Sequence, residues 1–219
     1  MRDYTYIDKY YDELLGDVYA QPTDSGHTKL SNEVIREWIF PLHISSVLDV
    51  GAGEGDAQIL LEQKGIGYTG IAIGEDVVKG KKAGHNLVEG DFNFLSYTGF
   101  DLVLSRHSLE HSPFPLITLM EWHRVSNHYL CLVLPNPLHY TYVGRNHYSV
   151  MEAHQAGWLL RRAGWKVKKF YLSEEEIWFL AEKVSRISYE GWAKTPLDGR
   201  VHELERDTYS EYGEHEMNW

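Results

Sequence analysis

The sequence predicts an α/β fold in which a largely parallel β-sheet is covered by helices on both faces. From Ser46 onward, short β-branched or apolar runs alternate with segments of helical length, and such alternation indicates parallel strands joined by crossover helices. The chain of 219 residues is long enough for one full core. Its hydrophobic content of 43% and charged content of 24% are typical of a globular protein.

The first elements are expected to be helical. Residues 4–19 and 31–41 both have helical periodicity, and the face of the first helix combines Ile7, Tyr10, Tyr11, Leu14 and Leu15. We therefore divide the chain into a helical lead-in (1–44), a core (45–184) and an acidic, aromatic C-terminal extension (185–219). The polar extension is either disordered or folded over the core through Tyr189, Trp192 and Trp219.

The core elements follow from local patterns. The expected strands are SVLDV, YTGIAI, NLVEG, FDLVLS, YLCLVLP and WKVKKFYL, and the expected helices are DAQILLEQKG, EDVVKGKKAG, FPLITLMEWHRV and MEAHQAGWLLRRAG. The segment IWFLAEKV has a length that suits either a helical turn or a strand. We predict a strand, because Ile177, Phe179 and Ala181 alternate with Trp178, Leu180 and Glu182.

Composition narrows the class of partner. The net charge of -11, from 32 acidic and 21 basic residues, repels phosphate backbones and anionic lipid, which favours a small-molecule partner over nucleic acid. The single Cys131 indicates a reducing compartment. No apolar run reaches the roughly 18 residues that span a bilayer, so we expect a cytoplasmic protein without a membrane partner. The oligomeric state is left open.

A glycine-rich turn follows the first strand. In VLDVGAGEGD, the apolar run ends at Asp49, and the turn holds Gly51, Gly53 and Gly55 before the next helix. Glycines here let the backbone approach a ligand, and N–H groups at the start of the helix face that ligand. Asp56 stands where the dinucleotide fingerprint has its third glycine, which argues against a nicotinamide or flavin enzyme.

This turn resembles motif I of the class I S-adenosylmethionine-dependent methyltransferases. Further segments resemble that family in the same order: Asp91-Phe92, FDLVLS, SRHSLEHSPFP and EWHRVSNHYLCLVLPNP. The resemblance covers about Ser46 to Lys183. It implies a Rossmann-like sheet of seven strands, the last antiparallel, and S-adenosylmethionine as the cofactor, with S-adenosylhomocysteine as the product. It implies cofactor contacts from Asp49, Gly51, Ala52, Gly53, Gly55, Asp91, Phe92 and Ser105, of which Asp91 and Phe92 lie beside the adenine.

The ribose position departs from the family pattern. In that family the second strand ends in an acidic residue that accepts the ribose hydroxyls, and in GIAIGED this place holds Ala72. Glu75 begins the next helix, where the helix dipole favours a carboxylate. We predict that Glu75 takes over the ribose contact. The alternative is that Glu75 and Asp76 are only acidic residues of the first helical turn.

A group of polar residues follows the fourth strand. His107, Glu110 and His111 suit three roles: fixing the loop, acting as a general base through either histidine, and binding a metal. Some quinone and RNA-terminal methyltransferases carry a metal-binding E-x-x-E-H here, but His107 replaces the first glutamate. We therefore expect His107 and His111 to be catalytic and no metal to be bound.

Together these features predict methyl transfer to a small or medium-sized acceptor. A hydroxyl oxygen is preferred because the two histidines offer a base, while nitrogen and carbon acceptors stay open. The N-terminal helices and the loop from His139 to Tyr148 would close the pocket. One alternative is a catalytically inactive binding or sensor protein of the same fold, favoured by Ala72. Another is an RNA methyltransferase, which the net charge disfavours.

Overall fold

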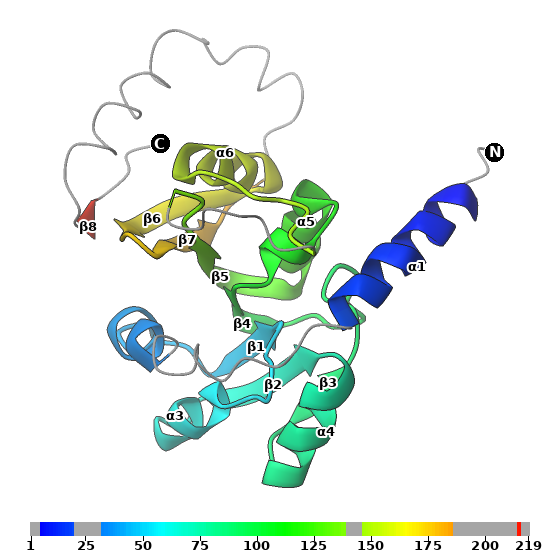
Figure 1. Ribbon diagram of the computed structural model, residues 1–219. Helices are drawn as coiled ribbons and strands as arrows, with labels where there is room; N and C mark the ends of the chain where they lie inside the picture. Colours follow the sequence, from blue (N-terminus) through cyan, green and yellow to red (C-terminus); the bar gives the residue numbers. More distant parts are fainter. Residues whose placement is uncertain (1–4, 20–31, 139–145, 186–213, 216–219) are drawn as a thin grey trace, which may run out of the picture.

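The computed structural model describes residues 5–19, 32–138, 146–185 and 214–215, and it confirms the predicted α/β architecture (Figure 1). The strands are β1 (Ser46–Val50), β2 (Gly67–Ala72), β3 (Leu87–Glu89), β4 (Phe100–Arg106), β5 (Ser126–Pro135), β6 (Trp165–Leu172), β7 (Glu176–Lys183) and β8 (Glu214–His215). The helices are α1 (Thr5–Tyr19), α3 (Ala57–Gln63), α4 (Gly74–Ala83), α5 (Pro115–Val125) and α6 (Ala153–Ala163). Two shorter turns are the π-helical η2 (Ile35–Ile39) and the 3-10 helical η3 (Leu109–His111).

The strands lie in the order β3-β2-β1-β4-β5-β7-β6-β8. Pairing is parallel from β3 through β5, whereas β7 is antiparallel to both β5 and β6. The predicted seven strands with an antiparallel last member are therefore confirmed, and β8 adds a short pairing to β6. Since β1 lies between β2 and β4, the strand order reverses beside it. Open α/β sheets bind ligands at the carboxyl ends of the strands at such a point.

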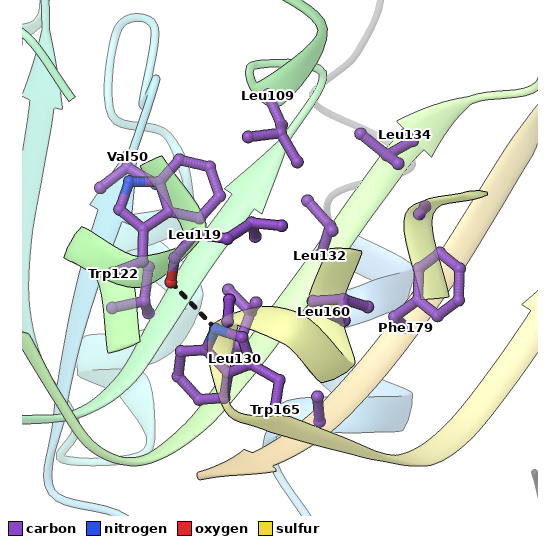
Figure 2. Packing of buried hydrophobic residues seen from close by; sticks show 14 of the residues in the cluster. Val50, Leu109, Leu119, Trp122, Leu130, Leu132, Leu134, Leu160, Trp165 and Phe179 are labelled. Carbon is purple, nitrogen blue, oxygen red and sulfur yellow. Dashed lines mark hydrogen bonds between the residues drawn. The ribbon is translucent and has the colours of Figure 1, made fainter. Parts of the chain in front are cut away.

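Helices cover both faces of the sheet, because alternate residues of each strand point to opposite sides. One face packs against η2, α3 and α4, where Trp38 of η2 meets Trp178 of β7 edge to face with ring centroids 5.6 Å apart. The other face packs against α5 and α6. Figure 2 shows its fully buried Trp122 and Trp165, and the Trp165 indole N–H donates to the Leu119 carbonyl over 3.1 Å. The apolar helix faces predicted from the sequence are therefore buried against the same sheet.

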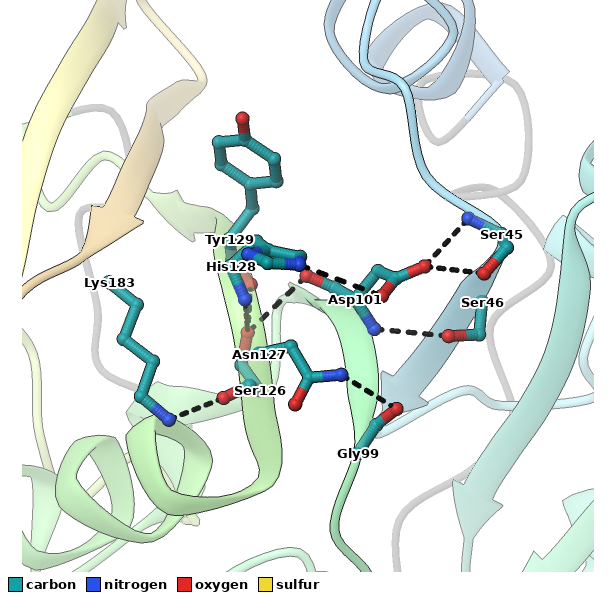
Figure 3. Close-up of polar contacts among 9 residues, drawn as sticks. All are labelled: Ser45, Ser46, Gly99, Asp101, Ser126, Asn127, His128, Tyr129 and Lys183. Atoms are coloured by element: carbon teal, nitrogen blue, oxygen red, sulfur yellow. Dashed lines mark hydrogen bonds and ion pairs between the residues drawn. The ribbon is translucent and has the colours of Figure 1, made fainter.

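Polar contacts join the amino ends of the central strands (Figure 3). The Asp101 carboxylate accepts hydrogen bonds from the Ser45 backbone N–H at 2.7 Å and the Ser45 hydroxyl at 2.6 Å. The Asp101 backbone N–H donates to the Ser46 hydroxyl at 3.0 Å. The bonds from Ser45 hold the pKa of Asp101 below its ordinary value. This junction fixes β1 beside β4 in the register that places Val50 next to Ser105 at the carboxyl edge.

The lead-in is helical as predicted, in α1 and again over residues 32–39. The expected apolar face of α1 is wrong at Tyr10, which is 62% exposed, whereas its neighbour Tyr11 packs against the rings of Phe94 and Phe114. No described helix is long and apolar enough to cross a bilayer. The predicted contacts of Tyr189, Trp192 and Trp219, and loop residues 139–145, lie outside the described residues.

Candidate functional site

The glycine turn lies at the carboxyl end of β1. Gly51, Gly53 and Gly55 have φ angles of 73°, 56° and 86°, a region that side chains disfavour. A Cβ on Gly51 would lie 1.9 Å from Ser108 Oγ, so this glycine lets the segment after β4 pack on the turn. A Cβ on Gly53 would meet nothing within 4 Å. Gly53 is therefore the position at which a ligand has room to approach the backbone.

Asp49 lies behind the turn instead of on its open side. Its side chain is buried at 6% exposure and accepts a hydrogen bond from the Tyr68 hydroxyl over 3.0 Å. Burial raises the pKa of Asp49 to about 7, and the bond from Tyr68 opposes that rise. The N–H groups of Gly51 and Ala52 donate to the Ile71 carbonyl, so a role of Asp49 in the cofactor site stays a prediction. A cationic group above the turn would further favour the ionised carboxylate.

The predicted ribose position carries no carboxylate of its own. Ala72 is buried at the end of β2, and Glu75 is in the first turn of α4 with a side chain that is 85% exposed and 3.6 Å from the Lys79 ammonium. Glu89 stands beside Ala72 in the parallel register of β3. Because Leu87 and Ala72 pack in the same cluster, Glu89, two residues after Leu87, shares that face of the sheet. Sequence reasoning missed Glu89, although its place at the end of the third strand was a usable signal.

Asp91 and Phe92, which we predict to lie beside the adenine, are held by contacts on two sides. Asp91 accepts hydrogen bonds from the backbone N–H and the amide of Asn93, both at 2.8 Å, and from the Tyr11 hydroxyl. The Phe92 ring lies edge to face with Trp122 at a centroid distance of 6.0 Å, and the Phe92 carbonyl accepts the Trp122 indole N–H at 2.9 Å. Phe92 is thus anchored to the core, while Asp91 is oriented by Asn93.

The structure separates the three polar residues that follow β4. His107 is the one residue other than glycine with a positive φ, 49°, in the described part of the chain. Its Nε2 lies 2.8 Å from Glu176 Oε1, an atom that also lies 2.6 Å from Arg106 Nη2. Burial would raise the pKa of Glu176, but the hydrogen bond from His107 and the charge of Arg106 lower it to about 2. Glu176 is therefore ionised beside His107, a partner that the sequence did not reveal.

Glu110 and His111 join a different residue, His147. Glu110 is 1% exposed, and burial raises its pKa to about 8. Burial also lowers the pKa of His111 to about 4. The rings of His111 and His147 lie edge to face with centroids 4.8 Å apart. The possible ligand atoms of these three residues all lie within 4.8 Å of one another. The spacing H-x-x-E-H therefore does not describe one cluster, because His107 turns toward Glu176.

Two further predicted positions, Ser105 and Ala52, differ in burial, because Ser105 is buried and Ala52 is half-buried. Ser105 is fully buried at the end of β4, and its hydroxyl has no hydrogen-bond partner among the described residues. Ala52 follows Gly51 in the turn, where its backbone N–H donates to the Ile71 carbonyl at 2.9 Å. Both lie where β1 and β4 end, within the segment that frames the glycine turn.

A cavity of about 470 Å³ opens beside Glu176, between η2 and the hairpin that joins β6 to β7. Its lining combines aromatic rings with carboxylates: Glu33, Glu37, Trp38, Tyr171, Ser173, Glu174, Glu175, Glu176 and Trp178. Flat rings stack well on such aromatic side chains, and the glutamates repel anions. The carboxylate that contacts His107 thus also forms part of a pocket wall.

Several residues predicted to contact the cofactor lie along the carboxyl edge of the sheet. Gly53 gives access to the backbone at one end. Glu75 and Glu89 flank the position where a ribose carboxylate is missing. Asp91 stands beyond them with its carboxylate oriented by Asn93. This edge of the sheet therefore combines an open glycine position with three carboxylates.

Residues 48–128 match the family model described as a methyltransferase domain. A solved S-adenosylmethionine-dependent methyltransferase from Archaeoglobus fulgidus is similar over 79% of this chain and 100% of its own, with 19% identity and a TM-score of 0.61. Magnesium protoporphyrin IX methyltransferase from Synechocystis, with bound S-adenosylhomocysteine, is similar over 83% of this chain and 100% of its own, with 16% identity and a TM-score of 0.60.

A third similar structure has a different name. The cyclase SpnF covers 76% of this chain and 85% of its own length, with 16% identity and a TM-score of 0.61. No curated protein sequence matches the chain significantly. The solved structures share the fold at identities below one fifth.

Proposed function

We propose that this chain methylates a hydroxyl oxygen of a small or medium-sized acceptor, because residues 48–128 match the methyltransferase-domain model and the chain shares the fold of solved S-adenosylmethionine-dependent methyltransferases. S-adenosylmethionine is the cofactor and supplies an electrophilic methyl group on a sulfonium. Methyl transfer needs the acceptor aligned with that methyl group, and an oxygen acceptor must also lose its proton.

The observation that carries the proposal is the His107–Glu176 pair. A carboxylate at 2.8 Å from one ring nitrogen orients an imidazole and stabilises the imidazolium that forms when the ring takes up a proton. The His107–Glu176 pair lies next to the glycine turn, because Ser108 follows His107 in the chain and packs on Gly51. The positive φ of His107 is a backbone strain of the kind found at functional sites.

His107 would therefore serve as the general base, with Glu176 as its positioning residue. The proton goes from the acceptor hydroxyl to the ring nitrogen of His107 that does not face Glu176. The hydrogen bond from His107 and the charge of Arg106 keep Glu176 ionised, so that a carboxylate faces the imidazolium that forms on His107. His111 is less suited to this role, because burial lowers its pKa to about 4 and its Nδ1 donates to the Asn146 carbonyl at 3.0 Å.

We place the acceptor in the cavity beside Glu176. The rings of Trp38, Tyr171 and Trp178 suit a flat acceptor, and the surrounding glutamates favour a neutral or cationic molecule over an anionic one. This lining and the net charge of -11 both disfavour RNA as the acceptor. The lead-in helix α1 would act as a lid, since it contacts residues that follow both β3 and β5.

A second candidate is a protein of this fold that binds the cofactor without methyl transfer. Ala72 favours it, because the methyl side chain cannot hold the ribose. One neighbour of the same fold is named a cyclase.

Calorimetry with S-adenosylmethionine and S-adenosylhomocysteine, followed by transfer of a labelled methyl group into small molecules of a cell extract, tests the proposal. We expect binding of both forms and a product whose O-methyl linkage is identified by nuclear magnetic resonance. His107→Gln should lower kcat about 100-fold or more while the affinity for S-adenosylhomocysteine changes little. His128→Gln is the control, since His128 is a surface residue on β5. Binding without any labelled product supports the second candidate, and failure to bind either form ends both.

A further inference from the structure

We propose that Glu110, His111 and His147 form a binding site for a divalent transition-metal ion. Two imidazoles and one carboxylate bring their possible ligand atoms within 4.8 Å of one another. The residues come from η3 and from the segment after β5, which lie 36 positions apart in the chain, from His111 to His147. The proposal goes beyond the methyl transfer proposed above and does not depend on it.

The backbone holds these two segments together. The Glu110 carbonyl accepts hydrogen bonds from the backbone N–H groups of Tyr148 and Ser149, at 2.8 Å and 2.9 Å. On the other side of His147, the Asn146 carbonyl accepts a hydrogen bond from His111 Nδ1 at 3.0 Å. His147 is thus fixed between two residues that are both anchored to η3.

The contact with Asn146 also orients His111 as a possible metal ligand. Because His111 uses Nδ1 to donate to Asn146, its remaining lone pair lies on Nε2, and such a second contact orients the imidazole of a metal ligand. Glu110 is 1% exposed, and its Oε2 has no hydrogen-bond partner among the described residues. A buried carboxylate oxygen without a partner is costly. A cation between Glu110 and the two histidines would satisfy it.

The donor set selects the kind of ion. Two nitrogens and one oxygen suit Zn²⁺ and its first-row neighbours, whereas Mg²⁺ and Ca²⁺ prefer oxygen ligands. Zinc bonds of about 2.0–2.2 Å put tetrahedral ligand atoms about 3.3–3.6 Å apart. The three side chains therefore need to close by little more than an ångström. Three protein ligands would leave a fourth position for water or another ligand.

The proposed metal site lies beside the glycine turn. Ser108, which begins the segment leading into η3, packs on Gly51. A metal ion bound here would therefore lie close to the proposed methyl-transfer chemistry, although His107 is directed to Glu176 and is not among its ligands. The proposal replaces the sequence-based expectation that no metal is bound.

Titration of the metal-free full-length protein with Zn²⁺ tests the site directly. We expect one Zn²⁺ per chain by calorimetry, and Co²⁺ bound in its place should show the intense visible absorption of a low-coordinate site. Glu110→Gln and His147→Ala should each weaken Zn²⁺ binding at least tenfold. His128→Ala, which removes a surface imidazole on β5, should bind Zn²⁺ like the parent.

Circular dichroism and S-adenosylhomocysteine binding measured on every variant separate folding and cofactor affinity from metal affinity. Glu110→Gln keeps the size of the buried side chain, so it tests the ligand even where His147→Ala unfolds the loop. Zn²⁺ binding that is equally tight in folded Glu110→Gln and in the parent would overturn the proposal, as would a stoichiometry well below one. Failure to bind S-adenosylhomocysteine would count against the proposed function alone.

Discussion

The Tyr11 hydroxyl of α1 donates a hydrogen bond to the Asp91 carboxylate after β3, across 80 positions of sequence. The Tyr11 ring also stacks on Phe114 at 5.8 Å between centroids. On the same helix, the Leu14 carbonyl accepts the Tyr148 hydroxyl at 3.3 Å. Helix α1 therefore joins two segments of the carboxyl edge, as a lid would.

Tyr11→Phe tests how firmly α1 is held. Loss of a hydrogen bond to a carboxylate removes about 1.5–3 kcal/mol, so amide hydrogen exchange in α1 should become at least tenfold faster while β1 and β4 keep their protection. Mass spectrometry of peptides after exchange measures this. Tyr10→Phe is the matched control, because Tyr10 is 62% exposed on the same helix. Equal exchange in the two variants would contradict a holding role for Tyr11.

Gly53→Ala separates binding from folding in the glycine turn. Its positive φ costs an alanine about 1–2 kcal/mol, but a Cβ there meets no protein atom within 4 Å. We expect a folded variant whose affinity for S-adenosylhomocysteine falls more than tenfold in calorimetry. Gly84→Ala carries the same strain, with a φ of 92° and an open position at the end of α4. It should lose comparable stability but bind the cofactor normally, and equal binding in both variants would remove Gly53 from the site.

Asp49→Asn should change how stability depends on pH. Burial raises the pKa of Asp49 to about 7 in the folded protein, so its contribution to stability is complete below the unfolded pKa near 4 and is lost as pH rises through 7. Relative to the parent, the variant should gain about 2–3 kcal/mol in unfolding free energy between pH 5 and pH 8. Urea denaturation at several pH values measures this. A stability difference between Asp49→Asn and the parent that does not change with pH would count against the raised pKa.

Glu176→Gln should destabilise the protein by about 3 kcal/mol at neutral pH, because Arg106 loses its buried counter-charge. The pKa of Glu176, lowered to about 2, determines how this stabilisation changes with pH. The stabilisation from this carboxylate is present above the ordinary glutamate value and is lost as pH falls through 2. The difference between parent and variant should therefore shrink between about pH 4 and pH 2. Glu175→Gln alters an exposed neighbour and should change stability little. Similar losses in both variants would contradict the special role of Glu176.

The ribose contact distinguishes two carboxylates. We expect Glu75→Ala to weaken S-adenosylhomocysteine binding about tenfold in calorimetry, because charged hydrogen bonds to the ribose hydroxyls are worth about 1.5–3 kcal/mol. Glu89→Ala is the direct competitor, since Glu89 lies beside Ala72 in the register of β3. Loss of affinity in Glu89→Ala alone would transfer the contact to Glu89, and no loss in either would leave the ribose without a carboxylate partner.

The alternation of strands and helices was predictable because each element carries its own periodicity. The strand over residues 176–183 is an example, since its two alternating apolar sets face two different helical layers. The glycine turn was predictable for the same local reason: its positive φ angles demand glycine at Gly51, Gly53 and Gly55. Tyr10 was assigned to the wrong side because helical spacing alone does not say where the core lies.

The sequence by itself determined the order of the elements, the glycine turn and the set of polar residues that follow the strands, because these depend on neighbours within a few positions. Only the tertiary structure decided which of those residues meet. The antiparallel entry of β7 beside β5 brings Glu176 to His107. Two backbone hydrogen bonds to the Glu110 carbonyl bring His147 to Glu110 and His111. Such meetings depend on long-range register and loop closure, which leave no periodic trace in the chain.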